Sequence, residues 1–127
     1  MKPIRYVITL VAVAASSLSL AGAPQDSQVV TTEDLIEMCS VSVDDPLYPA
    51  AKGFCLGYID AVMDYHAALT AGARYDPIAC PETAVTREEV VVVLVEWSQR
   101  NAQLLKDETP VTGVMRAAAE KWPCSAQ

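Results

Sequence analysis

The side chains best suited to chemistry in this sequence are a cysteine and a histidine in one apolar-rich segment, residues 54–69. Cys55 and His66 would form a thiol–imidazole pair only if the base lay about 3 Å from its nucleophile. The segment has the periodicity of a helix, in which two residues eleven positions apart are separated by roughly 16 Å along the axis. The two groups therefore cannot react together within one helix. We interpret His66 as a structural side chain, partly buried beside Ile59 and Val62.

A second candidate is the carboxylate pair Asp60 and Asp64, one helical turn apart. Two carboxylates can share general acid and base chemistry. On the polar side of an amphipathic helix, however, they are more commonly solvated charges. The chain also lacks a phosphate-binding loop, an HExxH motif and a nucleophile elbow. We therefore predict no catalytic residues, no cofactor and no enzymatic activity.

The first 21 residues are predicted to be a signal peptide. Lys2 and Arg5 form a short basic region, and residues 6–15 are an apolar run too short to serve as a stable membrane anchor. Small residues follow, and we expect cleavage after Ala21. The protein is therefore expected in the periplasm, with no membrane attachment after cleavage. Beyond the cleavage site, residues 22–31 are predicted to be a flexible lead-in, and residues 32–127 a single helical domain.

Export gives the cysteines a structural interpretation. Cys39, Cys55, Cys80 and Cys124 all follow the cleavage site, and an oxidising compartment favours two disulfides. A zinc site is the alternative, but no two cysteines have CxxC spacing and His66 is the only histidine. We therefore predict no metal site. The pairing is open at this point, because four cysteines permit three connectivities.

The first two helices are predicted from residues that cap a helix and from prolines and glycines that end one. Thr32 is expected to cap a short helix whose apolar side ends at Cys39, and a turn-rich segment follows. The second helix begins at or near Pro49 and runs to about Ala71. Gly72 is expected to end it in a left-handed conformation.

Two further helices follow a loop. Thr86 begins a Thr-x-x-Glu capping box, which opens a third helix from about Arg87 to Leu104 or Leu105. Its valine run alone would favour a strand, but the cap and the continuing helical period favour a helix. Thr109 and a first-turn proline open a fourth helix, which runs to about Trp122.

Each helix has an apolar face that is expected to point inward. The predicted inward residues of the first helix are Leu35, Ile36, Met38 and Cys39. Those of the second are Phe54, Cys55, Tyr58, Ile59, Val62, Tyr65 and Leu69. Those of the third are Val90, Val93, Leu94, Trp97, Asn101 and Leu104. Those of the fourth are Val111, Val114, Met115, Ala118 and Trp122. On the solvent face of the third helix, Glu96 and Arg100 are expected to pair one turn apart.

These elements predict an all-α fold, a small disulfide-stapled up-down bundle of about four helices. In such a bundle, Cys39 and Cys55 lie at the same end, and Cys80 and Cys124 lie at the opposite end. The favoured disulfides are therefore Cys39–Cys55 and Cys80–Cys124. Each should stabilise the fold by roughly 3–4 kcal/mol by restricting the unfolded chain.

Net charge limits the partners. The whole chain carries a formal charge of −7; without Lys2 and Arg5 it has seven basic against 16 acidic side chains, a charge of −9. Such a surface repels nucleic acid and anionic lipid and tolerates basic partners, although acidic surfaces also serve solubility alone. Four apolar residues at the edges of the helical faces are candidates for an interface or are ordinary surface residues: Leu56, Met63, Val92 and Val95.

Several motifs occur in a fixed order. Cys55-Leu56-Gly57-Tyr58-Ile59 lies near the start of a helix, Cys80-Pro81 follows, Thr86 opens a valine-rich helix, and Trp122-Pro123-Cys124 comes last. Over residues 32–124 this order resembles the Rap/Tai-type immunity proteins. The resemblance implies a small periplasmic helical protein that protects bacteria from type VI secretion effectors acting as peptidoglycan amidases.

The resemblance also implies a homodimer that inhibits by occlusion, with a loop between late helices filling the catalytic groove of the amidase. The matching connection here is about 101–109, and its candidate contact residues are Asn101, Gln103, Asp107 and Glu108. The sequence departs from the family pattern at this point: Arg100-Asn101-Ala102-Gln103 stands where a His-Pro-Glu-like segment is often found. The effector that matches this chain is therefore left open.

A function of another class fits the same residues, namely a periplasmic acid-stress chaperone of the small helical type. Acid would protonate many carboxylates, loosen the fold and expose a surface for client proteins. A single histidine provides little switching near neutral pH, so Asp and Glu would have to drive the change at lower pH. The neighbouring gene and a test of client binding in acid would separate the two hypotheses.

Overall fold

The computed structural model describes residues 28–125, which form four α-helices and one 3-10 helix and contain no strand. The predicted all-α class is confirmed. The predicted signal peptide and most of the lead-in lie outside the described residues. None of the described helices is long and apolar enough to cross a membrane. The elements are α1 (Thr32–Cys39), α2 (Tyr48–Thr70), α3 (Arg87–Arg100), η1 (Ala102–Leu104) and α4 (Pro110–Lys121).

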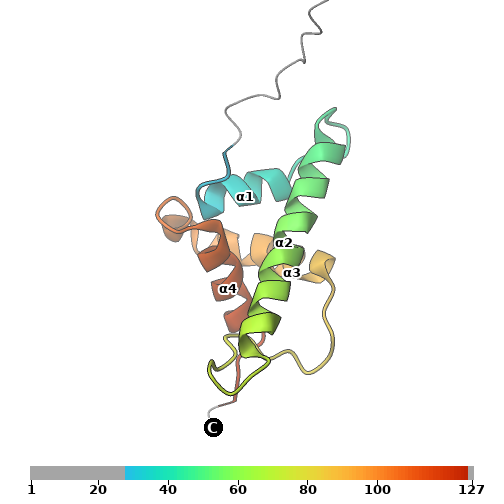
Figure 1. The fold of residues 1–127 in the computed structure, drawn as a ribbon. Coiled ribbons are helices and arrows are strands. Elements are labelled where there is room, and N and C mark those ends of the chain that lie inside the picture. The colour runs from blue at the N-terminus through green and yellow to red at the C-terminus, as the bar shows by residue number, and fades with distance from the viewer. Residues whose placement is uncertain (1–27, 126–127) are drawn as a thin grey trace, which may run out of the picture.

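The long helix α2 lies at the front of the molecule in Figure 1, and α3 passes behind it. The short helix α1 lies across the bundle between α4 and α2 (Figure 1). All six pairings of the four α-helices are in contact. Because α1 touches every other helix, it can hold segments of the chain that are far apart in sequence.

Helix α1 begins with a capping box built on Thr31, whereas Thr32 was the predicted cap. The Thr31 hydroxyl accepts the Asp34 N–H at 3.2 Å, and the Asp34 carboxylate accepts the Thr31 N–H at 2.8 Å. A capping box needs a polar side chain three residues after the cap. Asp34 provides one for Thr31, whereas Leu35 stands at that place for Thr32. Thr32 is instead fully buried.

The left-handed cap predicted at Gly72 is wrong. Helix α2 ends at Thr70, Ala71 is still right-handed with φ −62° and ψ −19°, and no described glycine has a positive φ. The Thr70 hydroxyl donates to the His66 carbonyl oxygen at 2.9 Å. This side chain supplies a donor for one of the last carbonyls, so the helix end does not depend on a glycine reversal.

Helix α3 opens with the predicted capping box of Thr86 and Glu89. It ends at Arg100, four or five residues before the predicted end. The Asn101 N–H donates to the Ser98 carbonyl oxygen at 3.2 Å, and the Asn101 side-chain amide donates to the Trp97 carbonyl oxygen at 2.9 Å. Asn101 thus ends helix α3. The apolar residues that predicted a longer helix continue at helical spacing through η1.

The predicted ion pair between Glu96 and Arg100 is not formed. The guanidinium of Arg100 donates to the backbone carbonyl oxygen of Glu96 at 3.2 Å and to the Glu120 carboxylate at 2.9 Å. Helix α4 packs against α3 and brings Glu120 within reach. A partner on a neighbouring helix thus replaces the local one.

The core contains most, but not all, of the residues predicted to point inward. In α2 the buried side is narrower than predicted: Phe54 is 42% exposed and Tyr65 is 65% exposed, and Leu69 is also exposed. In α4, Val111 is exposed as well. The other three helices cover one strip of α2, and its flank is left uncovered. The buried core cluster comprises Leu35, Cys55, Ile59, Val62, Val90, Val91, Val93, Leu94, Trp97, Leu105, Val114 and Ala117.

Both predicted disulfides are present. Cys39 pairs with Cys55, and Cys80 pairs with Cys124, over sequence separations of 16 and 44 residues. The first joins the end of α1 to an early turn of α2. The second joins the α2–α3 connection to the segment after α4. The structure thereby confirms the pairing that the alternating helix directions favoured.

Candidate functional site

Cys55 and His66 have structural roles. Cys55 is fully buried and is bonded to Cys39. The Nε2 atom of His66 accepts the Ile78 N–H at 3.0 Å, which fastens the α2–α3 connection to α2. His66 is partly buried, as predicted. An oxidised sulfur and an occupied ring nitrogen provide no nucleophile and base pair.

Asp60 and Asp64, the two carboxylates on the polar side of α2, have different surroundings. Asp60 accepts a charged hydrogen bond from Arg87 at 2.7 Å, which joins α2 to the first residue of α3. This bond is the main cause of a raised Arg87 pKa. Asp64 is exposed to solvent. The pair is therefore not a shared acid and base, and in residues 28–125 no cluster of three or more His, Cys, Asp or Glu side chains could hold a metal ion.

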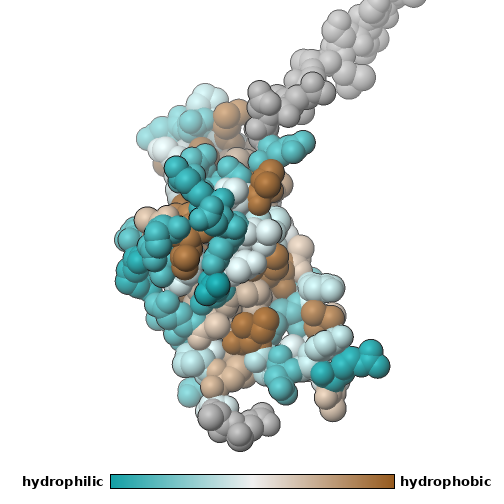
Figure 2. Space-filling view, turned by 90° about the vertical axis from the view of Figure 1, so that its left-hand side faces the viewer, coloured by the Kyte–Doolittle hydropathy of each residue, from teal (hydrophilic) through white to brown (hydrophobic). Residues whose placement is uncertain are grey.

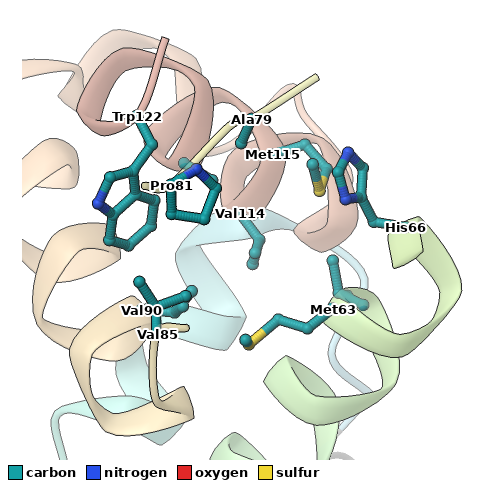
Figure 3. A pocket seen from close by; sticks show the side chains of 11 residues that line it. Met63, His66, Ala79, Pro81, Val85, Val90, Val114, Met115 and Trp122 are labelled. Atoms are coloured by element: carbon teal, nitrogen blue, oxygen red, sulfur yellow. The ribbon is translucent and has the colours of Figure 1, made fainter. Parts of the chain in front are cut away.

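An apolar cavity of about 110 Å³ lies among α2, α3, α4 and the α2–α3 connection. Figure 3 shows Trp122 on one side of it and His66 beside Met115 on the other. The remaining labelled lining residues are apolar, and His66 is the only titratable residue in the lining. The cavity is smaller than the sites that hold ordinary small-molecule substrates. It contains no arrangement suited to catalysis.

The α3–α4 connection contains the four residues predicted to contact a partner. It runs from Asn101 to Thr109 and includes η1. Gln103 and Asp107 are exposed to solvent, whereas Asn101 is half-buried and closes α3. Figure 2 shows the side of the molecule that lies on the left in Figure 1. Hydrophilic residues cover much of this face, and hydrophobic residues form smaller, separate groups.

Helix α1 holds this connection through its own backbone. The Thr32 N–H donates to the Glu108 carbonyl oxygen at 2.8 Å, and the Glu33 N–H donates to the Leu105 carbonyl oxygen at 3.0 Å. The first N–H groups of a helix have no partner within the helix. Here carbonyl groups of the connection satisfy two of them. The connection is therefore fixed in place by α1.

The buried Thr32 side chain adds to this attachment. Its hydroxyl lies 2.9 Å from the Thr109 carbonyl oxygen, to which it donates, and 3.2 Å from that of Glu108. Gly113 on α4 leaves the space that Thr32 occupies, since a Cβ atom there would overlap the Thr32 side chain. Close approach of α1 and α4 thus depends on this threonine and glycine. We call the contacts of Thr32 and Glu33 with the connection the α1 clamp.

Glu108 also helps to hold the α3–α4 connection in place. Its side chain is only 12% exposed, and one carboxylate oxygen forms an ion pair with the Arg116 guanidinium, 2.8 Å from its Nε atom. Its other oxygen, Oε2, is buried without a hydrogen-bond partner within residues 28–125. A weaker exposed pair, Lys106 with Glu33 at 3.8 Å, lies next to it. Of the four predicted contact residues, Gln103 and Asp107 are thus the freely exposed ones.

Sequence reasoning did not find Thr32, Arg116 or Gly113 as supports of the connection. Thr32 gave only a capping signal, and Gly113 gave none, because its contact with Thr32 joins distant parts of the chain. Arg116 lies close to Glu108 in the sequence, but no local pattern marked the pair. Of the apolar residues proposed for an interface, Val92 is 56% exposed, whereas Leu56, Met63 and Val95 are partly buried against the core. Phe54, Tyr65 and Leu69 are exposed apolar side chains on the flank of α2, and others lie in the connections on either side of that helix, at Leu47, Tyr75 and Ile78.

Comparison with curated proteins and with solved structures finds no match. The sequence model of one family, described as Rap1a immunity proteins, matches residues 31–124. The matched region contains all four helices, both disulfides and the α3–α4 connection. The chain therefore belongs to the Rap1a immunity proteins.

Proposed function

We propose that this protein is an exported immunity protein that binds a type VI secretion effector, a peptidoglycan amidase, and blocks its catalytic groove with the α3–α4 connection. Membership of the immunity family supports the general role. The observation that carries the specific proposal is the α1 clamp, which fixes an exposed polar connection in one conformation. A segment ordered before binding loses less conformational entropy on association.

The chemistry of the connection suits a groove lined by polar or basic groups. The Gln103 amide can donate and accept hydrogen bonds, and the Asp107 carboxylate can pair with a cation. Both side chains are exposed. Asn101 and Glu108 contribute mainly by shaping the segment. The Asn101 side chain donates to the Trp97 carbonyl oxygen, and the Glu108 side chain forms an ion pair with Arg116. Inhibition by this route needs no metal, cofactor or catalytic residue in the immunity protein.

The periplasm is the compartment where this activity belongs. Residues 1–21 have the pattern of a signal peptide, and the fold uses both pairs of its cysteines in disulfides. Disulfides persist in oxidising compartments, where peptidoglycan is also exposed to an amidase. We further propose that the protein acts as a homodimer and binds one effector per protomer.

The test is inhibition of the amidase encoded beside this gene. The full sequence is expressed with that neighbour, the complex is purified, and peptidoglycan cleavage is measured with increasing amounts of the immunity protein. The double variant Gln103→Ala with Asp107→Ala should weaken inhibition by roughly tenfold or more, as expected for losing two directional contacts at an interface.

The matched control is Asp76→Ala with Glu82→Ala, which removes two exposed polar side chains from the α2–α3 connection instead. It should inhibit like the wild type. Equal inhibition by all three proteins would show that the α3–α4 connection is not the blocking segment. Undiminished cleavage in the presence of excess wild-type protein would reject the amidase as the target.

A further inference from the structure

The α2–α3 connection, residues 71–86, is attached to the rest of the fold unevenly. Its middle is held by the Cys80–Cys124 disulfide and by the Cys80 N–H, which donates to the Trp122 carbonyl oxygen at 2.8 Å. The stretch before Cys80 has an attachment of another kind, because the Ile78 N–H donates to Nε2 of His66 at 3.0 Å. We call this hydrogen bond the His66 latch.

Within residues 28–125, the His66 latch is the one hydrogen bond that joins residues 71–79 to the rest of the chain. The Cys124 Sγ atom lies 3.3 Å from the Pro77 carbonyl oxygen, but a disulfide sulfur has no hydrogen to donate. Residues 71–78 are all exposed, and Ala79 is partly buried. Segments with few buried contacts open at a low cost in free energy. The position of residues 71–79 therefore depends on the bond to His66.

The accepting atom makes the His66 latch sensitive to pH. A neutral imidazole carries one hydrogen, so Nε2 accepts only while that hydrogen is on Nδ1. A proton added to Nε2 turns the acceptor into a donor that faces the Ile78 N–H, and the hydrogen bond is lost. Histidine is the side chain whose charge ordinarily changes between about pH 5 and pH 8. The His66 latch is therefore compatible only with a neutral ring.

The surroundings of His66 offer no partner for its charged form. The residues that line the cavity with it, from α2, α3, α4 and the connection, are apolar. Charged side chains next to the lining residues in sequence are exposed: Asp64 on α2, Glu82 in the connection, Glu89 on α3, and Arg116 and Lys121 on α4. Arg74 and Asp76, which precede Ile78, are exposed too. In the part of the chain that the structure describes, no ion pair includes His66.

From this geometry we infer that His66 is a pH-sensitive switch, whose protonation in mild acid releases residues 71–79 from α2. In the released form water solvates the charged ring, whereas the latched form holds only the neutral ring. The released form therefore binds a proton more readily. Low pH shifts the population toward it, and a return to neutral pH restores the latched form.

Release opens the apolar cavity on the side of His66. Ala79 of the connection and Met115 of α4 both line this cavity, and His66 lies beside Met115 (Figure 3). When the segment leaves, the Met115 side chain gains exposure. The opening is local, since Cys80 keeps its disulfide and its bond to Trp122. It does not involve the α3–α4 connection, so this inference is independent of the proposed inhibition of an amidase.

The test is exchange of the Ile78 amide hydrogen with solvent, measured by NMR from about pH 5 to about pH 8 and corrected for the intrinsic rate at each pH. In the wild type, protection should fall by about tenfold from the upper to the lower end of this range, as expected for losing one hydrogen bond. His66→Gln keeps an acceptor that does not titrate, so its protection should be equal at both ends. His66→Leu has no acceptor and should show low protection throughout.

The matched control is Asp76→Asn, which removes the carboxylate nearest in sequence to Ile78 and keeps His66. Its Ile78 amide should lose protection in acid as the wild type does, and circular dichroism checks that each variant is folded. A wild-type amide that is equally protected at both ends of the range would overturn the inference. A pH dependence that persists in His66→Gln, or disappears in Asp76→Asn, would assign the effect to carboxylates and overturn it as well.

A second measurement examines the ring itself. Nitrogen-15 chemical shifts of the imidazole at neutral pH should show the hydrogen on Nδ1 and a bare Nε2. A hydrogen on Nε2 would contradict the inference, because that tautomer has no acceptor to offer Ile78.

A third measurement examines the opening of the cavity. Hydrogen peroxide converts a methionine thioether to a sulfoxide and is itself reduced to water, so the rate reports access to the sulfur. Met38 on α1 is also partly buried and serves as the internal reference. Peptide mass spectrometry should find that Met115 oxidises faster relative to Met38 in acid in the wild type, but not in His66→Gln. A ratio that does not change with pH in the wild type would show that the cavity stays closed and refute the opening.

Discussion

At the scale of single residues, Thr32 has more influence than its place near the chain's beginning suggests. It is fully buried, and its hydroxyl and N–H both serve carbonyl groups of residues 108 and 109. The hydroxyl is a second donor to each carbonyl, because the Glu108 oxygen also accepts the Thr32 N–H and the Thr109 oxygen also accepts the Gly113 N–H. Each such hydrogen bond adds a modest net amount to stability. One side chain therefore links the stability of α1 to the conformation of the α3–α4 connection.

Replacing Thr32 with valine keeps the shape and removes the hydroxyl. We expect the free energy of unfolding to fall by about 1 kcal/mol, since the Glu108 and Thr109 carbonyls each keep a backbone N–H donor. Denaturant titration measures this loss. Thr112→Val is the control, because the Thr112 hydroxyl bonds only to that of Thr109 at an exposed position. A Thr32→Val protein as stable as the control would show that the hydroxyl adds nothing to the α1 clamp.

At the scale of elements, both α1 and α3 begin with capping boxes that use a carboxylate. In α1, backbone hydrogen bonds from Thr31 and then Val30 are the main causes of a lowered Asp34 pKa. In α3, the backbone hydrogen bond from Thr86, aided by its hydroxyl, lowers the pKa of Glu89. The ordinary pKa values are 3.8 and 4.5. Both carboxylates are thus bound more favourably in the folded state when ionised.

The sign of the pH dependence follows from these lowered values. A group with a depressed folded pKa contributes its full stability above its unfolded pKa and loses it as pH falls through the folded pKa. The contribution of Glu89 is therefore complete above about pH 4.5 and declines below it. Since a glutamine can keep the hydrogen bonds at every pH, Glu89→Gln should flatten the acid limb of the stability curve.

Unfolding midpoints between pH 3 and pH 7 would measure this flattening. The control Glu82→Gln removes an exposed carboxylate outside any helix and should follow the wild-type curve. A Glu89→Gln curve that descends as steeply as that of the control would show that the capping box of α3 does not contribute to acid sensitivity.

At the scale of the whole molecule, the two disulfides act on different parts. Cys39–Cys55 fastens α1, which carries the α1 clamp, to α2. Cys80–Cys124 closes the longer loop and fastens the α2–α3 connection to the chain's end. The chain-entropy argument gives about 3 kcal/mol for the first and about 4 kcal/mol for the second. Stability and inhibition should therefore respond differently to their removal.

We expect the double variant Cys80→Ala with Cys124→Ala to lose about 4 kcal/mol of stability and yet to inhibit the effector normally while it is folded. Cys39→Ala with Cys55→Ala should weaken inhibition, since α1 would hold the α3–α4 connection less firmly. Denaturant titration and the amidase assay together measure both effects. Loss of inhibition by a folded Cys80→Ala, Cys124→Ala protein would place the α2–α3 connection in the binding surface.

Much of this molecule follows from local patterns. The all-α class, the capping box at Thr86, the helix starts to within a residue and both disulfide pairings were predicted correctly. Caps and periodicity act within one or two helical turns, and the pairing needed only the alternation of short-linked helices. A role in partner binding for Asn101, Gln103, Asp107 and Glu108 stays a prediction. Of these four residues, Gln103 and Asp107 are exposed to solvent.

The sequence by itself therefore determined the four α-helices, their order and the pairing of the cysteines in two disulfides. Only the tertiary structure decided which flank of α2 is left uncovered, that Arg100 pairs with Glu120, and that Thr32 holds a carbonyl 76 residues away. Local signals cannot encode these choices. They arise when helices pack, because burial on one side of each helix selects which polar groups meet across the bundle.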